Sequence, residues 1–350
     1  MKQHNLILTD IIKTGHHYYY GNYIKNHSLF DHDVTVVDDY YVLPNNLDSF
    51  KRKIAIICTI NPWYMNNIEF ANDLDHRIKK LSSIGFKFIL AAPWESRANT
   101  ISNAIIKKYQ SICIDTWYCD GDWFWFFMYN KHYKNKNSFQ IDHTAKKYDF
   151  LYLNKQPREH RKLLFQKIQE ANLLENSLWS FIGLDNPKRL TKEYEPPWIA
   201  DGLITLANNN DQDQDIYERP YNHTQVNIIT ESNVNNNETF ITEKVWKAII
   251  MKQPFIVYGN NGTLTTLKEY GFSTFDNVFD ESYDKEIDLD KKIDKIIALC
   301  KTIKNNNFKD VYKNTETIRE NNFNNFFKKD NISKFVNSRL KKWFTNFEVK

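Results

Sequence analysis

The strongest constraint on the fold is a repeated alternation of short apolar runs with segments of helical periodicity. Residues 53–60 (KIAIICTI) form a continuous apolar run, which is typical of a strand buried on both faces of a sheet. Residues 68–84 carry helical periodicity, and Gly85 stands where a helix C-cap would. Residues 86–92 (FKFILAA) then predict a second buried strand. This β-α-β spacing predicts a parallel sheet with helices on both faces.

The same alternation restarts in the second half of the chain. We expect further strands at 111–115, 149–153, 179–184, 226–230 and 254–259, helices at 101–109, 158–174, 242–252 and 263–270, a polar linker at 130–147, an irregular stretch at 185–224 and a mostly helical tail from 288. A length of 350 residues predicts roughly two domains. We place an N-terminal Rossmann-like domain at 1–145, a C-terminal one at 146–330, and a final helix at 331–350 that could pack back on the first domain. Ligands of such folds lie outside the carboxyl ends of the strands, and a cleft between two domains is a natural site.

Composition excludes several functional classes. The chain has only 9 glycines and contains no G-x-G-x-x-G, G-x-x-x-x-G-K-[ST] or G-x-S-x-G motif, so the common dinucleotide, P-loop and α/β-hydrolase fingerprints are absent. A net charge of 47 − 43 = +4 is well below that of a dedicated duplex-DNA binder. No signal peptide and no run of about 18 apolar residues is present, so we expect a soluble, cytoplasmic protein without a membrane span. The four cysteines form neither a zinc spacing nor a disulfide framework: Cys58, Cys113, Cys119 and Cys300.

The segment most suggestive of chemistry opens the helix predicted at 242–252. Thr242 stands at its start, and Glu243 and Lys244 occupy its first turn on the side away from the apolar face. A helix N-terminus favours an anion, a lysine there adds a counter-charge, and a neighbouring glutamate can accept both hydrogens of a ribose diol. Together these residues predict a nucleotide-diphosphate site. The alternative is that Glu243 pairs with Lys247 on a solvated face.

Polar residues at other strand ends could reach the same site. Glu231 and Asn233 follow the strand predicted at 226–230, and Tyr258 ends the strand at 254–259, where the next loop could bring backbone N–H groups near a nucleotide.

A cationic segment opens another helix. Arg158, His160 and Arg161 follow the strand at 149–153, so they would face the same edge as Lys244, and arginine suits bidentate contact with phosphate. We favour Arg158 over Arg161, which could lie on the far side of the turn. The alternative interpretation is ordinary charge on a helix surface.

These motifs carry a resemblance to a known family. Glu231-Ser-Asn, followed by Thr239-Phe-Ile-Thr-Glu-Lys-Val-Trp-Lys247 and Gln253-Pro-Phe-Ile-Val-Tyr-Gly259, resembles the donor-binding region of α1,3-fucosyltransferases. It is also similar to loosely related glycosyltransferases of phages and marine microbes, which residues 267–275, 279–284 and the Pro-Arg-x-His-Arg pattern at 157–161 match better. The resemblance covers about 148–285, whereas the N-terminal half shows only a compatible α/β pattern.

The resemblance implies a fold and a set of roles. The fold would be the GT-B type, in which two Rossmann-like domains face each other across a cleft, with the nucleotide sugar on the C-terminal domain and the acceptor on the N-terminal one. Glu243 would hold the ribose and Lys244 the diphosphate, with Glu231 and Asn233 lining the same pocket. We include Arg158, Thr242 and Tyr258 in the expected donor site.

The catalytic base is expected on the N-terminal domain at a strand's carboxyl end. Inverting transfer needs a carboxylate or histidine within hydrogen-bond reach of the acceptor hydroxyl. Glu95, just after the strand at 86–92, meets this condition, although it could instead pair with Arg97 in a solvated loop. The competing candidates are His16, His17, Asp38 and Asp39.

A metal is not required by this scheme. Asp120 and Asp122 form an Asp-x-Asp pair that would suit Mg²⁺ or Mn²⁺, but the same spacing recurs elsewhere in this Asp-rich chain. Lys244 and Arg158 could stabilise the leaving diphosphate without a metal. We therefore expect no metal and no cofactor beyond the nucleotide-diphosphate sugar as co-substrate.

The sequence thus predicts a glycosyltransferase that is inverting and metal-independent. Its acceptor would be a glycan or, if a phage encodes the protein, a modified base such as hydroxymethylated DNA, with the host cytoplasm as its location. An alternative is a non-catalytic nucleic-acid or glycan-binding protein that uses aromatic stacking and Lys-rich segments. A third is a single-domain, metal-dependent transferase that uses Asp120 and Asp122.

Overall fold

The structure is a computed structural model that describes residues 4–10, 32–37, 54–58, 68–92, 104, 107–118, 122–142, 144–181, 194, 215–234, 239–306, 308–331, 334, 338 and 345. The chain divides into two compact units, Met1–Phe126 with Lys328–Lys350, and Phe127–Phe327. Helix α4 (Asp122–His132) contains the division, and a 3-10 turn, η2 (Tyr133–Asn135), follows it. The first part of the segment predicted to be a polar linker is therefore helical.

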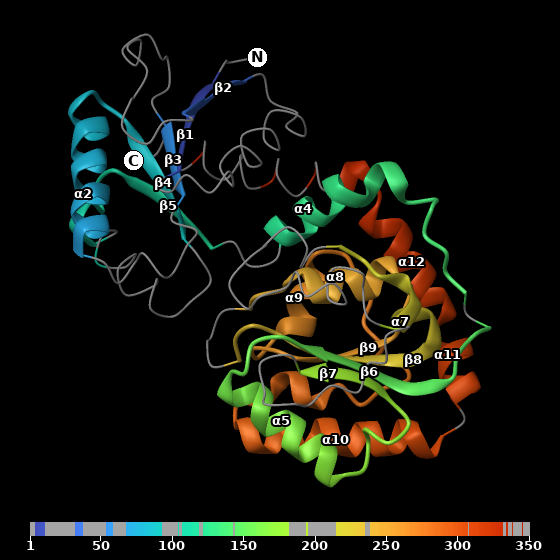
Figure 1. Cartoon of the computed structure of the whole chain (residues 1–350). Coiled ribbons are helices and arrows are strands. Elements are labelled where there is room, and N and C mark those ends of the chain that lie inside the picture. Colours follow the sequence, from blue (N-terminus) through green and yellow to red (C-terminus); the bar gives the residue numbers. More distant parts are fainter. Residues whose placement is uncertain are drawn as a thin grey trace. The chain divides into compact units, whose positions relative to one another are not determined.

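The first unit contains a five-stranded parallel sheet in the order β2-β1-β3-β4-β5 (Figure 1). Its strands are β1 (His4–Asp10), β2 (His32–Val37), β3 (Ile54–Cys58), β4 (Lys87–Ala92) and β5 (Cys113–Tyr118). Helix α2 (Ile68–Ser83) joins β3 to β4, and Gly85, shortly after its end as predicted, has a φ of 87°, the left-handed conformation that closes helices. The β3-α2-β4 prediction is confirmed, whereas β1 and β2 were not predicted.

The second unit contains a four-stranded parallel sheet in the order β7-β6-β8-β9. Its strands are β6 (Tyr148–Asn154), β7 (Leu178–Phe181), β8 (Thr224–Thr230) and β9 (Phe255–Tyr258). All four confirm sequence predictions to within a few residues. Every residue of β9 and all but one of β8 are buried, as expected where helices cover both faces of a parallel sheet.

Helices lie on both faces of this second sheet. Helix α5 (Glu159–Glu170) connects β6 to β7, and α8 (Glu243–Ile250) connects β8 to β9. The two connections run in opposite directions from the centre of the sheet, so right-handed crossovers place α5 and α8 on opposite faces. In Figure 1, α5 and α10 (Leu289–Asn305) lie on one face, and α8, α9 (Thr263–Glu269) and α12 (Glu316–Phe326) lie on the other. Helix α11 (Phe308–Asn314) precedes α12, so the described part of the tail is helical as predicted.

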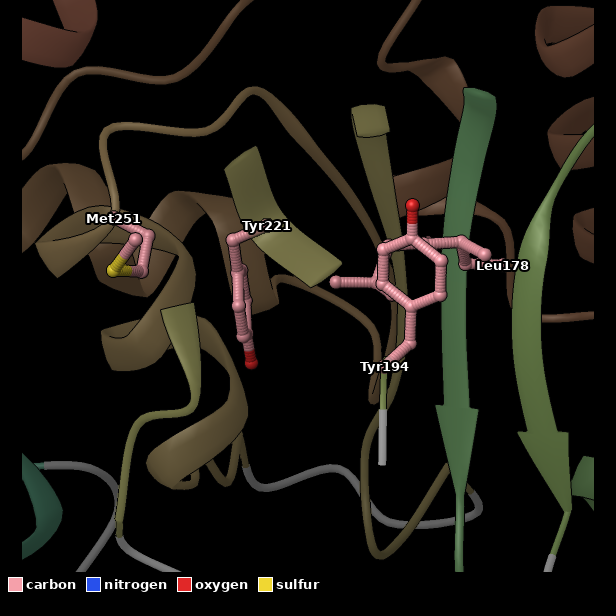
Figure 2. Packing of buried hydrophobic residues seen from close by; sticks show 5 residues of the cluster. Leu178, Tyr194, Tyr221 and Met251 are labelled. Atoms are coloured by element: carbon pink, nitrogen blue, oxygen red, sulfur yellow. The ribbon is translucent and has the colours of Figure 1, made fainter. Parts of the chain in front are cut away.

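Aromatic side chains tie the helices of the second unit to its sheet. Trp246 of α8 is fully buried, with its ring 5.2 Å from that of Phe272 and 5.9 Å from that of Phe326 of α12. A second cluster gathers residues from several separate segments (Figure 2): Leu151, Leu178, Tyr194, Tyr221 and Met251.

The stretch predicted to be irregular, 185–224, contains ordered structure. Helix α7 (Glu218–His223) lies within it, and Tyr194 is buried with its hydroxyl 2.8 Å from Nδ1 of His223. This prediction was therefore wrong for the described residues of the stretch, because tertiary packing of Tyr194 and Tyr221 outweighs the polar composition around them.

Strand β9 forms an edge of the second sheet. Its Val257 N–H donates to the hydroxyl of Tyr283, at 3.3 Å. Tyr283 is buried and belongs to the 3-10 turn η5 (Ser282–Lys285). The Tyr283 side chain thus accepts a hydrogen bond from a backbone N–H of β9 that does not pair with the neighbouring strand β8. Within the described ranges, no helix has the length and apolar character needed to span a membrane.

Candidate functional site

The order of strands in the second unit fixes where a ligand site is expected. The order reverses between β6 and β8, and in open parallel sheets ligands bind outside the carboxyl ends of the strands at this reversal. Four residues separate the end of β6 from the start of α5, and α8 follows the loop after β8. We call the polar side chains gathered here the switch-point cluster: Arg158, His160, Arg161, Glu231, Thr242, Glu243 and Lys244.

Glu231 joins the end of β8 to the start of α8. Its carboxylate accepts hydrogen bonds from the backbone N–H of Thr242, at 2.9 Å, and from the Thr242 hydroxyl, at 2.6 Å. Thr242 is the N-cap of α8, and its Oγ1 accepts from the backbone N–H of Lys244. Glu231 is 0% exposed, and this burial raises its pKa although Lys244 and Thr242 act in the opposite direction. Glu231 therefore fixes the helix N-terminus from within the protein.

Lys244 is held among oxygen atoms in the first turn of α8. Its Nζ lies 2.9 Å from Oε1 of Glu243, 3.0 Å from Oγ1 of Thr242 and 4.0 Å from Oε2 of Glu231. Burial would raise the pKa of Glu243, but the ammonium groups of Lys244 and Lys247 outweigh burial and lower it. The Glu243 side chain is only 15% exposed, so it does not lie on the solvated face that the alternative interpretation required.

The first turn of α5 contacts the residues that follow β8. Arg158 donates to the backbone carbonyl of Ser232, Arg161 Nη2 donates to the carbonyl of Glu231 at 3.3 Å, and His160 Nε2 lies 3.1 Å from the same carbonyl. Arg161 is buried, and burial together with the Arg158 charge lowers its pKa. The expectation that Arg161 could lie on the far side of the turn was wrong, because its guanidinium lies with that of Arg158.

His160 differs in charge from its arginine neighbours. Burial, together with the positive charges of Arg161, Arg158 and Lys244, lowers its pKa to about 4 against the opposing effect of the Glu231 carbonyl. The imidazole is therefore neutral at pH 7. The sequence pattern had grouped it with the cations, which was wrong for this side chain.

Strand β9 borders the cluster on the other side. Tyr258 is fully buried at the carboxyl end of β9, and its ring lies edge-to-face with that of His160 at 6.1 Å. Its hydroxyl has no hydrogen-bond partner among the described residues, and burial raises its pKa. The backbone carbonyl of Tyr258 accepts from the N–H of Glu231. A buried hydroxyl without a partner among the described residues thus lies beside the cluster of charges.

Taken together, the cluster suits an anion. Arg158, Arg161 and Lys244 supply three positive charges against the two carboxyl groups of Glu231 and Glu243. Two helix N-termini, those of α5 and α8, add their backbone donors. Charge-assisted hydrogen bonds from arginine and lysine at such a place are well suited to phosphate oxygens.

Several predicted site residues fall outside this cluster. Glu95 and its competitors His16, His17, Asp38 and Asp39 lie outside the described residues, as do Asp120 and Cys119. Asp122 begins α4, and Asn233 lies half-buried in the loop after β8. In the part of the chain that the structure describes, no group of three or more His, Cys, Asp or Glu side chains is arranged to hold a metal ion.

A cavity of about 720 Å³ lies away from the cluster. Its lining comes from α10, α11 and the loop at 277–280, and it includes Lys295, Thr302 and Asp310. None of the switch-point residues contributes to it. Sequence reasoning had no signal for this cavity, since its walls come from a polar loop and two tail helices.

Comparisons with known proteins give one likeness. No protein-family model matches the chain, and no curated protein matches its sequence. Among solved structures, the chain is similar to the crystal structure of an alpha1,3-fucosyltransferase with GDP-fucose. The two share 10% sequence identity at a TM-score of 0.39, and the similarity spans 99% of this chain and 91% of that chain.

Proposed function

We propose that this protein is a glycosyltransferase of the GT-B type that binds the diphosphate of a nucleotide sugar at the switch-point cluster. The observation that carries the proposal is the convergence of Arg158, Arg161 and Lys244, from the N-termini of two helices, on the carboxyl end of β8. The resemblance of residues 231–259 to the donor-binding region of α1,3-fucosyltransferases supports the same assignment.

In this scheme the cluster stabilises the leaving group electrostatically. Lys244 and Arg158 stabilise the negative charge that develops on the departing diphosphate. Glu243 accepts hydrogen bonds from the ribose hydroxyls, and Glu231 keeps the α8 N-terminus in position through Thr242. Asn233 and Tyr258 complete the donor site.

Binding would rearrange the pair that Lys244 and Glu243 form. Their 2.9 Å contact satisfies both charges in the free protein. A diphosphate offers Lys244 stronger acceptors, and Glu243 is then released to meet the ribose. The pair therefore exchanges an internal contact for two contacts with the ligand.

The remaining parts of the proposal combine the resemblance, which implies inversion and an acceptor on the N-terminal unit, with the positions of charged residues in the sequence, which suggest metal independence and Glu95 as the base. The reaction inverts the sugar's configuration without a metal, the N-terminal unit holds the acceptor, and Glu95 takes the proton from the acceptor hydroxyl. The acceptor is a glycan or, for a phage enzyme acting in the host cytoplasm, a hydroxymethylated DNA base that a duplex presents by flipping.

A thermal-shift screen tests the donor assignment. The probes are GDP, UDP, ADP, CDP and TDP with their nucleotide sugars, each with and without EDTA. A ligand that binds only the folded state stabilises it by mass action and so raises the melting temperature. At a ligand concentration of a hundred times Kd, the free energy of unfolding rises by about 2.7 kcal/mol. We expect a base-selective shift that EDTA does not reduce and that Lys244→Ala removes.

The matched control is Lys162→Ala. Lys162 lies on α5, its side chain is 41% exposed, and it pairs with Glu159 instead of a cluster residue. Both variants remove one positive charge, so a general effect of net charge would weaken binding equally in both. Equal losses, or no shift with any nucleotide, would overturn the proposal, and salt-sensitive binding of oligonucleotides alone would favour a non-catalytic binding protein.

A further inference from the structure

His160 carries a hydrogen-bonding atom that the proposed function leaves unassigned. Its Nε2 lies 3.1 Å from the backbone carbonyl of Glu231. A carbonyl oxygen can only accept, so Nε2 must carry the ring proton. In a neutral ring the other nitrogen, Nδ1, then has a free lone pair and acts as an acceptor. Among the described residues, no hydrogen bond engages this Nδ1 atom.

The surroundings of His160 keep the ring neutral. The guanidinium groups of Arg158 and Arg161 and the Lys244 ammonium are the charges that act on it, and all three are positive. Protonation would add a fourth positive charge to a partly buried site, which is unfavourable. The tautomer fixed by the Glu231 carbonyl is thus stable across the neutral pH range.

An acceptor is scarce among these side chains. Arg158, Arg161 and Lys244 can only donate, and the Glu231 carboxylate already accepts two hydrogen bonds from Thr242. Phosphate oxygens meet the donors, but the hydroxyl groups of a nucleotide sugar also need acceptors. Glu243 serves ribose hydroxyls in the proposed scheme, and Nδ1 of His160 is available for a further hydrogen bond from a hydroxyl.

We propose that Nδ1 of His160 accepts a hydrogen bond from a hydroxyl group of the bound nucleotide sugar. This inference rests on the proposed function. It adds a residue that recognises a hydroxyl group of the ligand, whereas the arginine and lysine side chains recognise its negative charge. The hydroxyl belongs either to the ribose or to the transferred sugar, and the experiment separates these two sources.

Two substitutions separate the two nitrogens of the ring. His160→Gln places an amide N–H where Nε2 lies, so it can keep the contact with the Glu231 carbonyl while it loses the acceptor at Nδ1. His160→Asn places an amide oxygen near Nδ1 and loses the donor to Glu231. If His160 only held Glu231 in place, His160→Gln would bind ligand normally and His160→Asn would not.

Calorimetric titration uses the nucleoside diphosphate and nucleotide sugar selected by the thermal-shift screen. We expect His160→Gln to weaken binding about three- to tenfold, the range of one neutral hydrogen bond, and His160→Asn to bind within about twofold of wild type despite a lower melting temperature. Loss for the nucleotide sugar alone assigns the hydroxyl to the transferred sugar. Equal loss for both ligands assigns it to the ribose.

The outcomes that overturn the inference differ from those that overturn the proposed function. If wild type binds and Lys244→Ala does not, the donor site is correct. Unchanged affinity of His160→Gln, or selective loss in His160→Asn, would then reject the role of Nδ1 alone. If wild type binds none of the nucleotides, both proposals fail together.

Discussion

Gly259 lies close to both Thr263, the first residue of α9, and Glu231, so replacing it tests how tightly this part of the site is packed. A Cβ atom at Gly259 would lie 2.8 Å from Oγ1 of Thr263 and 3.5 Å from Cγ of Glu231. Cβ atoms do not approach other heavy atoms as closely as the first distance. The Thr263 hydroxyl is fully buried and donates to the Asn260 carbonyl at 2.7 Å, so it cannot turn away without losing that bond.

In the Gly259→Ala variant, the clash with Thr263 can be relieved in two ways, either by a shift of the backbone or by rotation of the Thr263 hydroxyl. Moving the turn after β9 is an overpacking cost of about 1–3 kcal/mol, and leaving the Thr263 hydroxyl unpaired costs about the same. Since either route suffices, we expect a loss of about 1–3 kcal/mol in the free energy of unfolding. For a unit of about 200 residues, each kcal/mol lowers the melting temperature by about 2–4 °C.

A double-mutant cycle with Thr263→Ala measures the contact directly. Thr263→Ala removes Oγ1, so the methyl group at position 259 then has room. The loss of unfolding free energy in the double variant should therefore be at least about 1 kcal/mol smaller than the sum of the losses in the two single variants. Urea unfolding supplies the free energies. Gly271→Ala is the control, because its Cβ would lie 3.6 Å from the nearest atom and its cost comes from a φ of 84°. Additive losses at Gly259 and Thr263 would refute the steric argument.

Two further predictions concern buried charges. Burial raises the pKa of Glu231, so between its ordinary value of 4.5 and the raised value the folded state holds a proton that the unfolded chain has lost. The free energy of unfolding of wild type should therefore fall relative to Glu231→Gln as the pH rises through that window, and parallel urea-midpoint curves from pH 4 to 8 would contradict this. Arg319 is buried and donates to the carbonyls of Lys252 and Tyr312 at 3.0 and 2.9 Å while its guanidinium lies 3.6 Å from the Tyr312 ring centroid. Arg319→Ala should cost about 2–4 kcal/mol in urea unfolding and Arg319→Lys should recover only part of it, whereas a loss below about 1 kcal/mol would show that these contacts contribute little.

The sequence predicted those parts of the fold whose burial is uniform along the chain. Strand β9 and the 226–230 part of β8 are buried throughout, as expected where helices cover both faces of a parallel sheet, and their apolar runs gave a clear signal. Strands β1 and β2 mix histidine, asparagine and aspartate with apolar residues, so their pattern gave no such signal. Helix α7 has six residues and contains a proline, and only the burial of Tyr221 against distant segments explains its order.

The candidate site divides along the same line. The first-turn positions of Glu243 and Lys244 follow from the periodicity of one helix, and local pattern was enough to find them. The inward position of Arg161 and the tautomer of His160 depend on contacts with Glu231, which lies 70 and 71 residues further along the chain. Helical spacing fixes the angle of a side chain around its axis, but it does not say which neighbour the side chain will meet.

The hydrogen bond between Val257 and Tyr283 bears on how the protein avoids self-association. An edge strand with free N–H groups can add a strand from another chain, which is a common first step of aggregation. Strand β9 has only four residues, all apolar or aromatic, and would be a hazardous edge if it were open. The Tyr283 hydroxyl occupies the Val257 donor, and the buried ring stands beside the strand. A single phenol from a 3-10 turn thus removes the Val257 donor from those that another chain could use at this edge.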